Sequence, residues 1–208
     1  MTDQRIEAGT NDVYLVGTVE REPVYVYSER GYRIFEGMLS VPRRSGEIDH
    51  VPFVGDEQTL ADMNFGEYVS VAGVLRRRDR AAYPNCVHRL VVYASSVSKA
   101  APNWSVQNTV NLTGHLCREP GFRTTPRGRD VCELNIAIPR GGGRQDYVVC
   151  IAWHDWAHVA RNFNVGDTLQ CTGRFQSRDY LKRFPDGSTE QRMACEISLD
   201  AVTRITAR

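Results

Sequence analysis

The stretch "NDVYLVGTVEREP", residues 11–23, decides the fold, because residues 108–120 repeat it as "NTVNLTGHLCREP". Both stretches place an asparagine, a valine, a leucine, a glycine and a closing Arg-Glu-Pro at matching positions. Extended over residues 11–46 and 108–143, the comparison gives 13 identities in 36 positions without a gap. Self-similarity over this length indicates a tandem duplication of one structural unit.

The duplication predicts two similar domains. After a shift of three residues the match resumes, with residues 65–79 lying over residues 165–179. The segment "SKAAPNWS" (98–105) has small residues and a proline, which is typical of a short linker. We therefore expect an N-terminal domain over residues 1–99, a linker over 100–107 and a C-terminal domain over 108–208.

Each copy has the pattern of a small β-barrel. In the second copy, apolar and polar residues alternate over 110–116, as in a strand with one buried face. Further strands are expected over 131–138, 146–153, 167–180 and 192–202, and a short helix over 155–163 with Trp156, Val159, Ala160 and Phe163 facing the core. This order, with glycines at barrel corners, is typical of an OB-fold. The predicted fold is all-β: two tandem OB-fold five-stranded barrels, each with a short helix between strands 3 and 4.

Composition narrows the class of protein. The chain is 41% hydrophobic and 25% charged with a net charge of +1, as is usual for a globular protein. No apolar run approaches the ~18 residues of a membrane span, and no signal-peptide core is present. We expect a cytoplasmic, nucleoid-associated protein without a membrane partner. Lys99 and Lys182 are the only lysines among 26 basic residues; this excess of arginine suits phosphate binding, although codon bias in a GC-rich genome explains it equally well.

Cysteine and histidine patterns predict neither a disulfide framework nor a metal site. The six cysteines include no C-x-x-C pair, so buried free thiols are expected. His154 and His158 have the i, i+4 spacing of a zinc-binding helix, with Asp155 where a metalloprotease has its glutamate. The remaining histidines supply no patterned third ligand, and aspartate is shorter than the usual base. We expect no metal, no cofactor and no enzymatic activity.

Three segments resemble bacterial-type single-stranded DNA-binding proteins: residues 108–140, "DYVVCIAW" (146–153) and "GDTLQCTGRFQSRDY" (166–180). The resemblance covers residues 108–202 and, more weakly, 11–97. It implies a non-catalytic protein that binds single-stranded DNA. It also implies a homodimer, because family members often assemble four barrels and this chain carries two.

The chain departs from that family in two places. Arg140 and the glycines after it stand where the family has a further aromatic residue. The family typically ends in a disordered acidic tail that recruits other proteins, whereas this chain ends "SLDAVTRITAR" (198–208). We therefore expect any replication or repair partners to bind without such a tail. A mobile-element, phage or auxiliary version of the family is favoured.

Single-strand binders combine aromatic faces for bases with a basic groove for phosphates. Along the fourth strand, alternation places Arg174, Gln176, Arg178 and Tyr180 on one side, and Leu169, Cys171, Gly173 and Phe175 on the other. The resemblance places base-stacking aromatics at Tyr147, Trp153 and Tyr180. The alternative is that these aromatic side chains serve only in the packing of the barrel. Further candidate contacts in the second copy are Arg140, Arg144, Lys182, Arg183 and Phe184.

The first copy keeps charge and loses stacking groups. It has His50, Asp56 and Arg80 opposite Tyr147, Trp153 and Tyr180. Its candidate phosphate contacts are Arg43, Arg44, Arg76, Arg78 and Arg80. Two interpretations stay open: the copy extends the DNA site, or it serves as a dimerisation or partner-binding module. Tyr25, Tyr27 and Tyr32 would either replace the lost stacking groups or serve in packing.

The sequence thus predicts sequence-independent single-stranded DNA binding in replication, recombination or repair, with the second copy as the better binder. Stacking chemistry would accept RNA as well. The alternative is an OB-fold adaptor, a scaffold subunit of a replication or conjugation complex that binds nucleic acid weakly. The aromatic-poor first copy favours this second hypothesis.

Overall fold

The computed structural model describes residues 9–61, 63–79, 81–83, 86, 88–101, 105 and 107–205. Contacts divide the chain into two compact units. One holds residues 13–109 together with 174–197, and the other holds residues 110–173 and 198–205 with the first described residues. Each unit is described by itself below.

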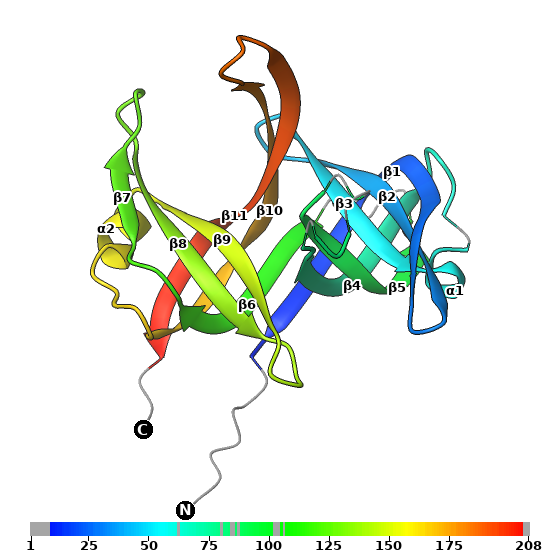
Figure 1. The fold of residues 1–208 in the computed structure, drawn as a ribbon, viewed down its shortest axis with the longest axis horizontal. Helices are drawn as coiled ribbons and strands as arrows, with labels where there is room; N and C mark the ends of the chain where they lie inside the picture. Colours follow the sequence, from blue (N-terminus) through cyan, green and yellow to red (C-terminus); the bar gives the residue numbers. More distant parts are fainter. Residues whose placement is uncertain are drawn as a thin grey trace, which may run out of the picture. The chain divides into compact units, whose positions relative to one another are not determined.

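The first unit is built around a closed ring of five strands: β1 (Asn11–Glu29), β2 (Tyr32–Pro42), β3 (Ile48–Asp56), β4 (Tyr68–Arg77) and β5 (Leu90–Lys99). The strand order is β2-β3-β5-β4-β1, and a further β1–β2 pairing closes the ring (Figure 1). The β3–β5 pair is parallel, while β1–β2, β1–β4, β2–β3 and β4–β5 are antiparallel. Helix α1 (Glu57–Leu60) lies between β3 and β4 in the chain. Leu15, Leu39, Phe53 and Leu75 are fully buried inside the ring.

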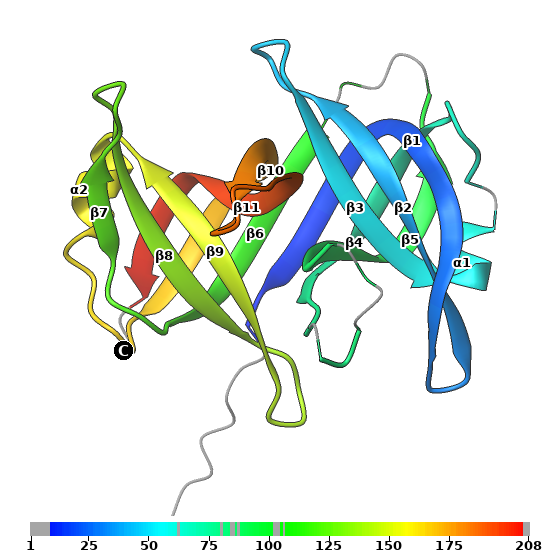
Figure 2. The same cartoon turned by 45° about the horizontal axis from the view of Figure 1, so that its top comes forward.

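The second unit repeats this arrangement with β6 (Gln107–Leu116), β8 (Asp130–Pro139), β9 (Gln145–Trp153), β10 (Thr168–Arg183) and β11 (Thr189–Ile205). Their order is β6-β10-β11-β9-β8, closed by a β6–β8 pairing, and β7 (Gly121–Thr124) extends the sheet beside β8 (Figure 2). Helix α2 (Asp155–Ala160) comes between β9 and β10. A short helix after the third strand of each ring, as the sequence predicts, is therefore confirmed.

The repeated glycine of the opening motif has a structural reason. Gly17 and Gly114 lie on the first strand of each ring, beside the strand that closes it. A Cβ atom would approach the Ser40 carbonyl oxygen to 2.6 Å at Gly17, and the Ala137 carbonyl oxygen to 2.6 Å at Gly114. Because backbone cannot move aside as a side chain can, only glycine allows the strands to approach this closely.

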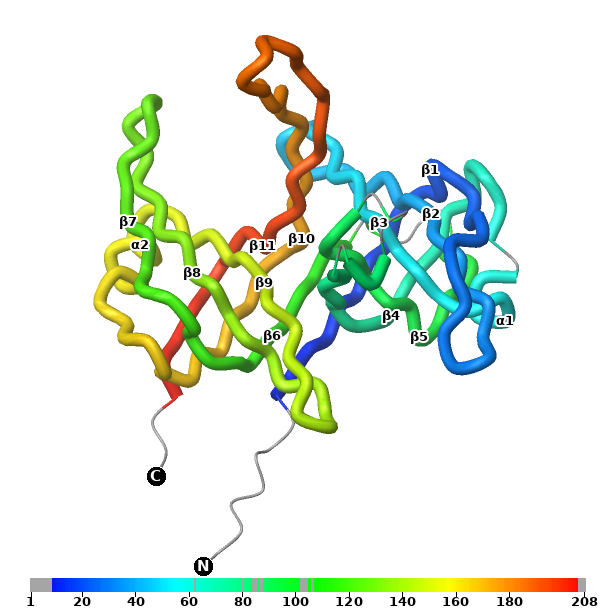
Figure 3. The backbone as a smooth tube through the Cα atoms, viewed as in Figure 1, coloured from blue at the N-terminus to red at the C-terminus, as the bar shows by residue number. Residues whose placement is uncertain are grey.

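The strands β10 and β11 continue beyond the second ring as a long hairpin, residues 174–197, called the arm here. Figure 3 traces its backbone in orange, out along β10 and back along β11. The last β6–β10 pair is Val110 with Gly173. From Arg174 to Ile197 the arm forms one compact unit with residues 13–109.

Two expectations about helix α2 fare differently. Ala160 and Phe163 are buried, as the helical spacing predicts. Val159 is wrong as a core residue, because its side chain is 44% exposed. The buried side chains of α2 are Ala157 and Ala160, so its buried face is centred away from Val159.

All six cysteines are free thiols. Cys132, Cys150 and Cys171 are buried, as expected, and the other three are half-buried. Burial raises the pKa of Cys132 to about 11 and that of Cys195 to about 12, so both stay protonated near neutral pH. None of the helices within the described ranges is long and apolar enough to cross a membrane.

Candidate nucleic-acid interface

Alternation along β9 creates an exposed aromatic surface on the second ring. Asp146, Val148, Cys150 and Ala152 point inward and are buried, so the residues between them lie on the outer side. Tyr147 is 48% exposed there, and Trp153 is half-buried. We call this surface the outer face; its exposed or half-buried members on β8 and β9 are Glu133, Asn135, Tyr147, Val149 and Trp153.

Arg129 adds a cation that the sequence analysis missed. Its guanidinium carbon lies 5.3 Å from the centroid of the Trp153 ring, a cation–π geometry. Arg129 comes from the hairpin before β8, and Val131 is paired with Trp153 in the β8–β9 register. The pairing of β8 with β9 brings Arg129 close to Trp153, 24 residues later in the chain, and the sequence shows this contact only if the strand register is known.

The two arginines of the glycine-rich loop after β8, Arg140 and Arg144, have different surroundings. Gly141, Gly142 and Gly143 all have positive φ, which glycine adopts without strain. The Arg140 amide donates to the Arg144 carbonyl oxygen and closes the loop. The Arg140 guanidinium lies 3.7 Å from the buried carboxylate of Asp146, whereas Arg144 is exposed. Arg144 is thus the arginine of this loop that can reach a phosphate most directly.

The arm carries six of the predicted contacts: Arg174, Arg178, Tyr180, Lys182, Arg183 and Phe184. Tyr180 is 39% exposed, and the Arg178 guanidinium lies 6.0 Å from its ring centroid. Lys182 places its ammonium 4.9 Å from the Phe184 ring. Arg192, from β11, lies 5.7 Å from the same ring and was not predicted from the sequence. Aromatic rings beside cations are the combination that binds stacked bases and their phosphates.

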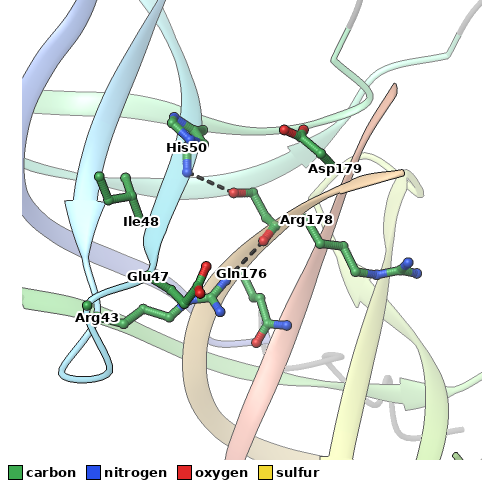
Figure 4. A pocket seen from close by; sticks show the side chains of 9 residues that line it. Arg43, Glu47, Ile48, His50, Gln176, Arg178 and Asp179 are labelled. Carbon is green, nitrogen blue, oxygen red and sulfur yellow. Dashed lines mark hydrogen bonds between the residues drawn. The ribbon is translucent and has the colours of Figure 1, made fainter. Parts of the chain in front are cut away.

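A cavity of about 560 Å³ lies where the arm meets β3 and the loop before it (Figure 4). It is lined by Arg43, Gly46, Glu47, Ile48, His50, Gln176, Ser177, Arg178 and Asp179. Predicted contacts Arg43 and Arg178 are brought together here. Arg178 is exposed, 3.7 Å from Glu196, while Arg44 next to Arg43 in the chain is also exposed.

Arg43 is largely engaged inside the protein. Its guanidinium donates to the Asp49 carboxylate at 2.9 Å through Nε and at 2.5 Å through Nη2. The hydrogen bond to Asp49 is the main reason that the pKa of Arg43 is raised. Arg174 also lies 3.4 Å from Asp49. Both arginines, predicted as phosphate contacts, therefore share one buried carboxylate.

The matching outer face of the first ring is covered. Ile34, Glu36 and Met38 of β2 and Val54 of β3 are all buried. Val26, Tyr27 and Tyr93 pack against this surface. Burial raises the pKa of Tyr27 to about 12. A covered surface of this kind offers no open aromatic platform for bases.

Arg78 corrects the sequence prediction. It was expected on the same exposed side as Arg76 and Arg80, yet it is 5% exposed. Its Nη2 donates to Glu36 Oε2 at 2.5 Å and to the His88 carbonyl oxygen at 2.9 Å. Its amide still donates to the Arg89 carbonyl oxygen at 2.8 Å, so strand pairing continues to this residue; Arg78 is buried because it faces Glu36 on the covered side of β2. Arg76 is half-buried and donates to the Leu75 carbonyl oxygen, and Arg80 lies outside the described residues.

Among the other first-copy residues, His50, Asp56 and Tyr25 have structural partners. His50 Nδ1 lies 2.6 Å from Glu20, and Asp56 accepts a hydrogen bond from the Thr59 amide and caps α1. Tyr25 packs edge-on against Phe35. Tyr32 is 63% exposed. Positions that match Tyr147 and Trp153 therefore hold hydrogen-bonding groups in the first ring.

His88 makes the stability of the first ring depend on pH. Burial lowers its pKa below 6.5, although Glu36, 3.8 Å away, opposes the shift. The unfolded chain therefore binds a proton more readily than the folded chain as pH falls below about 6.5. We expect the free energy of unfolding to decrease from pH 7 down to the lowered folded pKa. Denaturant unfolding at several pH values measures this, and the dependence should weaken in His88→Gln.

The predicted absence of a zinc site stays a prediction, but the geometry of the motif is clear. His158 Nε2 lies 3.0 Å from Asp130 Oδ2, and its ring packs against Phe122. Within the described ranges, no group of three His, Cys, Asp or Glu side chains could hold a metal ion. His158 thus serves to pack α2 against the β7–β8 hairpin.

Sequence comparison finds single-stranded DNA-binding proteins among the proteins similar to this chain. The single-stranded DNA-binding protein of Deinococcus radiodurans is 24% identical over 84% of this chain and 70% of its own length. The protein of the same name from Oceanobacillus iheyensis is 34% identical over 39% of this chain. This and several other relatives are spanned over only about half their length.

Structural comparison shows the fold. The wild-type single-stranded DNA binding protein from Thermus aquaticus superposes with a TM-score of 0.72, at 22% identity, over 96% of this chain and 95% of that chain. A deletion mutant of that protein gives the same TM-score with 98% coverage of both chains. The family model of the single-strand binding protein family matches residues 107–205, which identifies the C-terminal half of this chain as the part that matches that family.

Proposed function

We propose that this protein binds single-stranded DNA without sequence preference and without catalysis, in replication, recombination or repair. The observation that carries the proposal is the outer face of the second ring, where Tyr147 and Trp153 are accessible beside Arg129. Arginine and lysine replace counterions along the phosphates, and the rings stack on unpaired bases. Duplex bases are already stacked, so duplex DNA is disfavoured. RNA meets the same chemistry.

We propose that the architecture behind this function is a pair of OB-folds. The five-stranded closed ring in each copy, with a short helix after its third strand, supports this. We propose domains over residues 1–99 and 108–208 with a linker over 100–107, the arm of the second domain reaching into the first unit. A homodimer would bring four barrels together, in the cytoplasm with the nucleoid.

A titration of tryptophan fluorescence with oligo-dT, with duplex DNA as the control, tests the proposal. Quenching that saturates at submicromolar oligonucleotide and is absent for duplex supports it. Quenching should vanish in Trp153→Phe if that ring is the reporter. Absence of any binding would refute the proposal and favour the adaptor hypothesis, which the covered outer face of the first ring supports.

Binding is expected to weaken with salt, because each phosphate contact releases counterions. For single strands the slope of log Kobs against log salt is about −0.7 per contact. Arg144→Ala and Arg183→Ala, both exposed cations, should each reduce the slope by about 0.7. Arg118→Ala, an exposed arginine outside the candidate set, is the matched control. A slope unchanged in both variants would remove these residues from the site.

A further inference from the structure

The arm begins where the β6–β10 pairing ends, and side chains hold its first residues there. Beyond Gly173, the Phe175 amide donates to Asn108 Oδ1 at 2.8 Å, and the Asn108 side-chain amide donates back to the Phe175 carbonyl oxygen at 2.8 Å. Two residues later the Ser177 amide donates to Asp49 Oδ1 at 2.9 Å. Unpaired backbone groups of a strand edge need such partners when they are buried.

The amide, the carbonyl oxygen and the hydroxyl oxygen of Ser177 each form a hydrogen bond with a residue of the first unit. Its carbonyl oxygen accepts from Arg43 Nη2 at 2.9 Å, and its hydroxyl oxygen accepts from the His50 amide at 2.8 Å (Figure 4). Asp49 is fully buried and also takes the two hydrogen bonds of Arg43 and the ion pair with Arg174. One buried carboxylate thus joins β3, the loop before it and β10.

We propose that Asp49 is the positioning residue of the arm, and that the first ring contributes to nucleic-acid binding by holding the arm rather than by offering a stacking face. The inference rests on the proposed function. Its second support is the contrast between the two rings: the outer face of the first is covered, while the arm that it holds carries Tyr180 and Phe184 with their cations. A surface held in its bound conformation loses less conformational entropy when it binds.

Asp49→Asn, which keeps the shape and removes the charge, tests the inference. We expect the Ser177 amide to exchange with solvent about tenfold faster or more, because its acceptor loses the charge that strengthens the bond. Affinity for a long oligo-dT of roughly 30 nucleotides should fall about tenfold. Quenching of Trp153 by roughly 8 nucleotides, a length suited to one barrel, should not change. Asp200→Asn, an exposed aspartate of β11, is the matched control.

The outcomes separate this inference from the proposed function. If the wild-type protein binds no oligonucleotide, the proposed function fails, while hydrogen exchange still decides whether Asp49 holds the arm. An unchanged exchange rate at Ser177, or faster exchange with unchanged affinity for the long oligonucleotide, overturns the inference. Should Asp49→Asn not fold, Ser177→Ala removes only the acceptor of the His50 amide and should show the same pattern with smaller changes.

Discussion

Replacing both Tyr147 and Trp153 by alanine should weaken the binding of oligo-dT by about 30-fold or more. Stacking contributes about 1–3 kcal/mol per base, so two rings contribute about 2–6 kcal/mol, at about 1.4 kcal/mol per decade of affinity. Both side chains lie on the outer face, and Tyr147 is 48% exposed. Fluorescence anisotropy of a labelled oligonucleotide measures the loss independently of tryptophan emission.

Two controls separate stacking from packing. The double substitution Tyr147→Phe and Trp153→Phe keeps an aromatic face at each position and should retain most of the affinity. Phe65→Ala removes an aromatic side chain that is 70% exposed in the first unit and should have no effect. Near-ultraviolet circular dichroism checks that the alanine variant remains folded. A folded alanine variant with wild-type affinity would show that these rings only pack.

Arg78→Ala should lower the free energy of unfolding by about 3–5 kcal/mol. The substitution leaves the Glu36 carboxylate buried without its closest cation, and breaking a buried ion pair from one side costs this much. Arg21, 3.9 Å from Glu36 and half-exposed, compensates only in part. Urea denaturation followed by circular dichroism measures the change. Arg76→Ala, on the same strand and half-buried, should cost much less.

A double variant distinguishes charge from packing at this site. Glu36→Leu combined with Arg78→Met replaces both charges by apolar groups of similar volume and should recover most of the lost stability. The affinity of folded Arg78→Ala for single-stranded DNA should match the wild type. A variant of normal stability that binds DNA poorly would mean that the Arg78 guanidinium acts at a nucleic-acid surface instead.

The sequence predicted the ring strands and the helix of the second copy individually, because each depends on patterns of short range, and the comparison of the chain with itself extended the prediction to the first copy. Alternation identified the inward residues of β10, and helical spacing identified Ala160 and Phe163. The same reasoning was wrong for Val159 and Arg78. Periodicity gives the side on which a residue lies but not what covers that side: Val159 lies on an exposed flank of α2, and Arg78 faces the buried Glu36.

Most of the candidate site could be named from the sequence, but not its organisation. Tyr147, Trp153, Tyr180 and Phe184 were predicted as aromatic contacts and all remain accessible or half-buried. Arg129 and Arg192 were missed, because their neighbours come from other strands through the register and the hairpin. The role of Asp49 was also invisible, since its partner Ser177 lies 128 residues away in the chain.

By itself the sequence determined that the chain repeats one β-rich unit, which residues of the fourth strand of the second copy face its core, and that aromatic and basic groups gather in that copy. Those features follow from local periodicity and from the comparison of the chain with itself. Only the tertiary structure decided that the outer face of the first ring is covered, that Arg78 is a buried ion-pair partner, and that the arm is held by Asp49. The alternation of apolar and polar residues specifies on which side of a strand a residue lies. What covers that side depends on contacts between segments far apart in the chain.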